Sequence, residues 1–69
     1  MAESVYKVIE LIGTSTESWG KAAMAAIERA GESLRDLRVA EVLELDVAVG
    51  EKGGLRYRAK VRVSFKYED

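Results

Sequence analysis

Residues 39–67 decide the fold of this chain. They read Val-Ala-Glu-Val-Leu-Glu-Leu-Asp-Val-Ala-Val at 39–49, Gly-Glu-Lys-Gly-Gly at 50–54, and Leu-Arg-Tyr-Arg-Ala-Lys-Val-Arg-Val-Ser-Phe-Lys-Tyr at 55–67. Two runs rich in β-branched and aromatic residues flank a glycine-bearing turn, which is the pattern of a β-hairpin. The second run alternates between apolar and mostly basic residues. Successive side chains of a strand point to opposite faces, so we expect one apolar face and one charged face.

The turn predicts which residues of the two strands lie opposite each other. We place the loop at residues 51–53, closed by Gly50 and Gly54. This register sets apolar side chains against apolar ones and acids against bases, and a slip of one residue would destroy both matches. The predicted pairs are Leu43 with Val61, Leu45 with Ala59, Val47 with Tyr57, Glu44 with Lys60, and Asp46 with Arg58.

The N-terminal half predicts a strand followed by a helix. Residues 5–12 are β-rich, and Gly13 is expected to end that strand. One of the hydroxyl residues at 14–16 is expected to cap a helix that runs from about residue 17 to about residue 34. Apolar residues recur there at steps of three and four, which predicts one buried stripe. The stripe consists of Trp19, Ala22, Ala23, Ala26, Ile27, Ala30 and Leu34.

The element order is therefore strand, helix, strand, strand, in a single domain covering residues 1–69. A right-handed crossover makes the first and second strands parallel, and the hairpin makes the third strand antiparallel to the second. The simplest sheet places the third strand in the middle. We predict an α+β fold of β-α-β-β order, with a three-stranded antiparallel sheet partly wrapped around one helix.

Composition narrows the functional classes. The 69 residues include no cysteine and no histidine, and the formal net charge is −1. Without histidine, the serines and threonines lack the usual triad base, so we expect no enzyme. The near-neutral charge argues against nucleic-acid and membrane partners, and the basic stripe at residues 56–66 is interpreted as a sheet face neutralised by facing acids. No apolar run approaches the ~20 residues that span a bilayer, so we expect a cytoplasmic protein.

The lengths of the elements predict self-association. A third strand of about 13 residues extends roughly 43 Å, whereas a helix of about 18 residues covers roughly 27 Å. One alanine-rich helix cannot cover such a sheet, and long exposed edges invite pairing with another copy. We expect a closed homo-oligomer; the alternative is a monomer with frayed strand ends.

The sequence resembles the dodecin family over nearly its whole length. Four segments carry the resemblance: Val-Tyr-Lys-Val-Ile-Glu-Leu-Ile-Gly-Thr-Ser at 5–15, Ala-Ile-Glu-Arg-Ala at 26–30, Val-Ala-Glu-Val at 39–42, and Tyr-Arg-Ala-Lys-Val-Arg-Val-Ser-Phe at 57–65. The resemblance implies a hollow homododecamer of β-α-β-β subunits. In flavin-binding dodecins, pairs of flavins lie between subunits, and the proteins store or buffer flavin without catalysing a reaction.

The positions that correspond to the family's flavin site are occupied here by Val39, Glu44 and Arg58. The resemblance implies a stacking tryptophan at position 39 and a hydrogen-bonding glutamine at position 58. Valine has no π-face, so it loses a stacking contribution of about 0.5–1.5 kcal/mol. Arginine donates hydrogen bonds but cannot accept them, so it does not replace the amide. We therefore expect flavin binding to be weakened or lost.

The sequence is more similar to a branch of the family that has an Arg-Val-Ala segment, here at 38–40, and a Ser-Trp pair, here at 18–19. That branch is associated with calcium. From the residues themselves, the candidate metal ligands are Glu41, Glu44 and Asp46, contributed by several copies because calcium needs about six to eight oxygens. The alternative is that Glu44 and Asp46 pair with the basic residues across the hairpin.

We therefore expect a non-enzymatic, dodecin-like hollow homo-oligomer that binds or stores a small ligand or ion. One alternative is a dodecin that still binds and stores riboflavin or FMN, and a second is a purely structural assembly.

Overall fold

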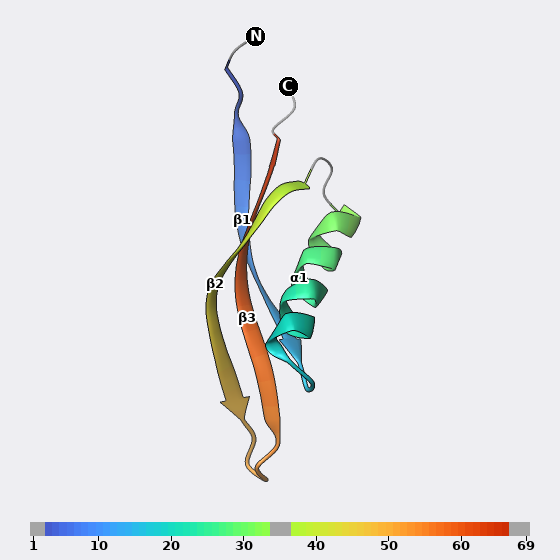
Figure 1. Ribbon diagram of the computed structural model, residues 1–69, viewed down its shortest axis with the longest axis vertical. Helices are drawn as coiled ribbons and strands as arrows, with labels where there is room; N and C mark the ends of the chain where they lie inside the picture. Colours follow the sequence, from blue (N-terminus) through green and yellow to red (C-terminus); the bar gives the residue numbers. More distant parts are fainter. Residues whose placement is uncertain (1–2, 34–36, 67–69) are drawn as a thin grey trace.

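A computed structural model describes residues 3–33 and 37–66, and it has the predicted order of elements. These are β1 (Tyr6–Ser15), α1 (Trp19–Ser33), β2 (Leu37–Val49) and β3 (Leu55–Lys66). The strands form one sheet in the order β1-β3-β2, in which β3 is antiparallel to both neighbours. The helix lies against one face of that sheet (Figure 1). The predicted β-α-β-β fold is confirmed. Leu34 and Tyr67, which the sequence prediction placed on the helix stripe and in the third strand, lie outside the described residues.

The core is small and consists of alanines facing valines. The residues below a tenth exposed are apolar throughout the described chain, and the two largest fully buried side chains are Val61 and Val63. Alanine contributes little buried area, but its short side chain lets α1 lie close to the sheet. The buried apolar residues are Ala22, Ala26, Ala30, Ala59, Val61 and Val63, with Ile9, Leu11, Ala23 and Leu37 packed around them.

The prediction that Gly13 ends the first strand is wrong. β1 continues to Ser15, and Gly13 is buried opposite Ala59. A Cβ atom added at Gly13 would lie 2.0 Å from the backbone oxygen of Ala22 and 3.0 Å from the Cβ of Ala26. Glycine is therefore needed at this position because the helix passes directly over the strand.

The predicted helix cap is also wrong, because the helix begins later. α1 begins at Trp19, and the Oγ of Ser18 accepts a hydrogen bond of 3.0 Å from the backbone N–H of Lys21. Ser18 is therefore the N-cap. Ser15 instead stabilises the preceding turn, where its Oγ accepts a 2.9 Å hydrogen bond from the backbone N–H of Glu17. A serine in each position satisfies the amides of two successive turns.

The hairpin turn forms as predicted, but the register contains a bulge. Gly50 donates a 2.7 Å hydrogen bond to the Gly54 oxygen, and Gly53 has a positive φ of 82°. Four predicted pairs are confirmed: Leu45 with Ala59, Val47 with Tyr57, Glu44 with Lys60, and Asp46 with Arg58. The fifth is wrong, because Val42 rather than Leu43 lies opposite Val61, and the register shifts between Val42 and Glu44.

The hairpin extends beyond the helix. The molecule measures 55 × 20 × 16 Å, and Figure 1 shows α1 beside the middle of the sheet while β2 and β3 continue past it. We call residues 45–57 the hairpin end. Three of its large apolar side chains are open to solvent: Leu45 is 52%, Val49 71% and Leu55 50% exposed. No helix within the described residues is long and apolar enough to cross a membrane.

Candidate functional site

The face of the sheet directed away from α1, called here the outer face, carries a ladder of ion pairs. Because Ala59, Val61 and Val63 face the helix, the alternating residues of β3 point the other way. Three of the basic residues among them, Arg58, Lys60 and Arg62, each have an acidic neighbour. The pairs are Arg58 with Asp46 at 2.7 Å, Lys60 with Glu44 at 3.8 Å, Arg62 with Glu41 at 3.8 Å, and Arg62 with Glu10 at 3.1 Å.

The bulge in β2 is what brings Glu41 and Glu44 to the same face. These residues are three apart in sequence, so a regular strand would point them to opposite sides of the sheet. Their partners Arg62 and Lys60 are only two apart, and the register shift between Val42 and Glu44 absorbs the extra residue. The unequal spacing of acids and bases in the sequence was the signal for this bulge.

Asp46 and Arg58 form the tightest of these pairs. Nε of Arg58 donates to one carboxylate oxygen of Asp46 at 2.7 Å, and Nη2 donates to the other at 2.9 Å. The hydrogen bonds from Arg58, more than its charge, lower the pKa of Asp46 although slight burial opposes the shift, and the same bonds raise the pKa of Arg58. Both groups are therefore fully charged at neutral pH and already engaged with each other.

A small hollow separates this pair from the next one. It has a volume of about 70 Å³ and is lined by Ile12 and by the side chains of two neighbouring pairs, Glu44 with Lys60 and Asp46 with Arg58. Pockets for organic ligands usually have about 300–1,000 Å³. The hollow therefore has the size of an ion or a few water molecules and is too small for a flavin ring.

Val39 lies far from Arg58 within one chain. Val39 is opposite Ser64, whereas Arg58 is opposite Asp46. The six residues of β3 between positions 58 and 64 correspond to about 20 Å at 3.3 Å per residue. Val39 is 60% exposed on the outer face, so it is free to contact a ligand or a neighbouring copy. The family flavin positions thus come together only if several copies contribute them.

The three candidate metal ligands lie in a row and do not converge. Glu41, Glu44 and Asp46 are successive acids on the outer face, each opposite a base. Within residues 3–33 and 37–66, no three acidic side chains lie close enough to hold one metal ion. A calcium site on these residues therefore requires oxygens from more than one copy.

Sequence reasoning missed the hydrogen bond that Trp19 makes to this site. Trp19 was predicted to lie on the buried stripe of the helix, but it is 40% exposed. Its ring does meet Tyr57 edge to face, with centroids 5.0 Å apart and planes at 72°. In addition, Nε1 of Trp19 donates a 2.9 Å hydrogen bond to the backbone oxygen of Asp46. This bond ties the start of α1 to the strand residue that binds Arg58. A long-range contact of this kind leaves no local sequence signal.

The fold and the outer face define a class of protein: a small β-α-β-β chain with an open hairpin and a sheet face that carries a row of ion pairs. Comparison with known families is consistent with that class. The family model described as Dodecin matches residues 5–68. This chain belongs to the dodecin family.

Two curated relatives match almost the full chain. Calcium dodecin of Mycobacterium tuberculosis is 56% identical over 63 residues, covering 91% of this chain and 89% of the relative. Dodecin of Thermus thermophilus is 42% identical over 65 residues, covering 94% of each. The sequence identity is thus higher with the relative named for calcium than with the T. thermophilus dodecin.

Solved structures agree with the fold. The crystal structure of the M. tuberculosis calcium dodecin, described as calcium-chelating with a novel calcium-binding site, has a TM-score of 0.88 and 54% identity, covering 94% of this chain and 93% of that one. Dodecin from Streptomyces coelicolor has a TM-score of 0.89 at 26% identity, covering 100% and 99%. The architecture is therefore retained while much of the sequence changes.

Proposed function

We propose that this protein is a non-enzymatic, hollow homododecamer that binds calcium at the junctions between subunits and has weakened or lost the flavin binding of other dodecins. The observation that carries the proposal is the two-hydrogen-bond pair between Asp46 and Arg58. Within this pair, Arg58 stands at the position where the family resemblance implies a flavin-binding glutamine. The similarity to calcium dodecin supports calcium as the ligand.

Assembly is proposed from what one copy leaves open. Val49 and Leu55 are at least half exposed at the hairpin end, and both outer strands are long, with β2 reaching 13 residues. Long, flat edges with exposed apolar side chains favour pairing with a second copy. The small alanine core leaves few other ways to stabilise a 69-residue chain that lacks cysteine.

Among the three candidate ligands, Glu44 and Glu41 are proposed to bind calcium, and Asp46 is proposed to stay with Arg58. Glu44 lies 3.8 Å from Lys60, and its side chain is 69% exposed. Glu41 lies 3.8 Å from Arg62, which is closer to Glu10 at 3.1 Å. These loosely held carboxylates can turn to a cation at low cost, whereas Asp46 would have to leave two short hydrogen bonds.

Thermal unfolding of the assembled protein with and without calcium tests the calcium proposal. A cation that binds the folded form stabilises it by about 2.7 kcal/mol at a hundredfold excess over its Kd. We expect calcium to raise the Tm, magnesium to raise it less, and Glu44→Gln to reduce the calcium effect. Glu32→Gln, on the exposed face of α1, is the matched control. An equal calcium effect in both variants contradicts the assignment of Glu44.

A riboflavin titration tests the other half of the proposal. We expect little quenching of riboflavin fluorescence at micromolar protein, and a gain of affinity in the double variant Val39→Trp, Arg58→Gln. Strong quenching by the unchanged protein would favour the second candidate function, flavin storage. An unchanged titration in a correctly assembled double variant would contradict the placement of the family positions.

A further inference from the structure

The inner face of β2, which is the face directed toward α1, carries apolar side chains that are largely open to solvent. Residues that lie opposite each other in antiparallel strands share a face. The β2 residues opposite the helix-facing apolar residues of β3 are therefore on the inner face. All of them except Val47 are at least half exposed, and apolar patches of this kind mark interaction sites. We call them the inner strip: Val42, Leu45, Val47 and Val49.

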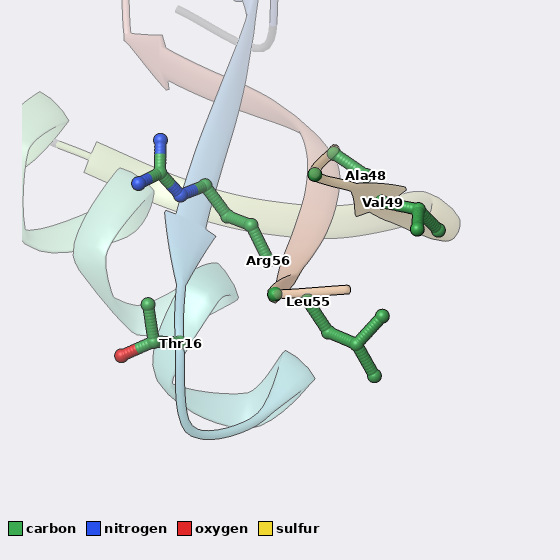
Figure 2. A pocket seen from close by; sticks show the side chains of 7 residues that line it. Thr16, Ala48, Val49, Leu55 and Arg56 are labelled. Atoms are coloured by element: carbon green, nitrogen blue, oxygen red, sulfur yellow. The ribbon is translucent and has the colours of Figure 1, made fainter. Parts of the chain in front are cut away.

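The inner strip is uncovered because α1 lies to one side of it. The helix packs over β1 and β3 and hardly contacts β2 (Figure 1). Figure 2 shows the end of the strip, where the Val49 side chain is directed away from Arg56 on the outer face. The strip itself carries no charged or polar side chain. Its burial therefore requires an apolar partner that brings no charge.

The open space over the strip has the dimensions of a second helix. Val42 and Val49 are seven residues apart, which corresponds to about 23 Å at 3.3 Å per residue. The 15 residues of α1 cover about 22 Å at 1.5 Å per residue. Packed helices lie about 8–10 Å apart, and neighbouring strands about 5 Å. A helix packed beside α1 would therefore lie over β2.

The helix of this chain carries a second apolar side that fits the space. Gly20, Ala23, Met24 and Ile27 recur at steps of three and four, so they share one side of α1, called here the helix flank. Met24 is 52% exposed. A Cβ atom added at Gly20 would meet only the Oγ of Ser18, at 3.8 Å, so no close contact within the described chain requires glycine there. The flank is uncharged, and its small residues permit close approach of a sheet.

We propose that the inner strip of each copy binds the helix flank of a second copy, with Met24 of one copy packing near Leu45 of the other. The inference rests on the proposed assembly and adds which surfaces form it. The apolar residues on the outer face of β1 match the strip less well, because Glu10 separates Val8 from Ile12 and an unpaired buried charge is costly. Strip and flank are different surfaces, so the contact is head-to-tail and its repetition can close a ring of copies.

Cross-linking tests the contact, because the chain has no cysteine of its own. Chains with Met24→Cys and chains with Leu45→Cys are co-expressed so that they assemble together, and the assembly is treated with a short bismaleimide. We expect covalent pairs of chains on a denaturing gel. Either variant alone should stay as single chains, since equal positions of two copies do not meet in a head-to-tail contact. The matched control combines Met24→Cys with Val8→Cys, which is 50% exposed on the outer face and should also give no pairs.

A charge placed on the helix flank tests its energetic role. Met24→Glu is expected to weaken assembly at least about tenfold in sedimentation, because the carboxylate would be buried against the inner strip. Val5→Glu is the control, since Val5 is 64% exposed and lies outside both surfaces, and its assembly should be unchanged.

The results separate this contact from the proposed assembly. An assembled protein in which the Met24→Cys and Leu45→Cys chains form no pairs would overturn the contact and leave the assembly standing. A protein that sediments as a single chain would overturn both. Covalent pairs from Leu45→Cys alone would show that strip packs on strip, and equal assembly of Met24→Glu and Val5→Glu would show that the flank is not buried. Either result would also overturn the inference.

Discussion

The two halves of the β2–β3 hairpin differ in how they are covered. Beneath α1, Val61 and Val63 are completely buried although the helix offers them mostly alanine. At the hairpin end, Val49 and Leu55 belong to the same ribbon, yet they are 71% and 50% exposed. The two halves have similar β-forming sequences, so the difference comes from the length of the helix and not from the strands. One half is stabilised within the chain, and the other is available for a second copy or a ligand.

The largest expected effect comes from adding a side chain at Gly13, where α1 lies against β1 in the covered half. Gly13→Ala would place a Cβ 2.0 Å from the Ala22 oxygen, so the helix must move away from the core. We expect a loss of about 3 kcal/mol or more of the free energy of unfolding, measured by urea denaturation. Gly31→Ala is the control: a Cβ there meets nothing within 4 Å, and the change should stabilise the helix by about 0.5–1 kcal/mol. Equal effects of the two changes would contradict the close approach.

The next effect compares the two halves directly. Val61→Ala removes two fully buried methyl groups and is expected to cost about 2 kcal/mol in the free energy of unfolding. Leu55→Ala at the hairpin end is expected to leave that energy nearly unchanged when assembly is suppressed by dilution, but to weaken assembly at higher concentration. Similar losses for both variants in the dilute protein would show that the hairpin end is covered within a single copy.

Ser18→Ala tests the start of the helix in the covered half. The change removes the acceptor for the Lys21 N–H, and loss of an N-cap costs about 1 kcal/mol. Thr16→Ala is the control, since its hydroxyl does not cap α1 and its replacement should have less effect. Circular dichroism during thermal unfolding measures both. A larger loss for Thr16→Ala would reassign the cap.

The smallest expected effect concerns the ion pair where the hairpin end begins. Because hydrogen bonds from Arg58 lower the folded-state pKa of Asp46, the pair stabilises the folded chain above the ordinary pKa of about 3.9. That contribution is lost as the pH falls through the depressed folded-state pKa. Asp46→Asn should therefore lose less stability than the unchanged protein between pH 7 and pH 3. Arg58→Gln should show the same flattened dependence in urea midpoints; an unaltered pH dependence in both would contradict the pair's role.

Much of this fold follows from local patterns in the sequence. The alternation in β3 and the glycines at 50–54 predicted the hairpin, its turn and most of its register, because strand period and turn geometry act over a few residues. The prediction for Gly13 was wrong because its reason is the approach of Ala22 in the helix, which is not encoded nearby. The cap was missed because several hydroxyl residues compete in one short stretch.

The candidate site was predicted less completely. The pairs Asp46–Arg58 and Glu44–Lys60 followed from the register, and the bulge beside Leu43 was available in the unequal spacing of acids and bases. The hydrogen bond from Trp19 to Asp46 depends on where the start of the helix meets the hairpin. Such contacts arise only from the three-dimensional arrangement. Whether Glu41 and Glu44 bind calcium stays a prediction.

The central claim is that the exposed hairpin end packs against other copies of the chain. Sedimentation equilibrium of the unchanged protein at micromolar concentration tests this claim most directly. We expect a closed assembly of twelve chains with little dissociation. A stable species of 7.6 kDa, the mass of one chain, would contradict it.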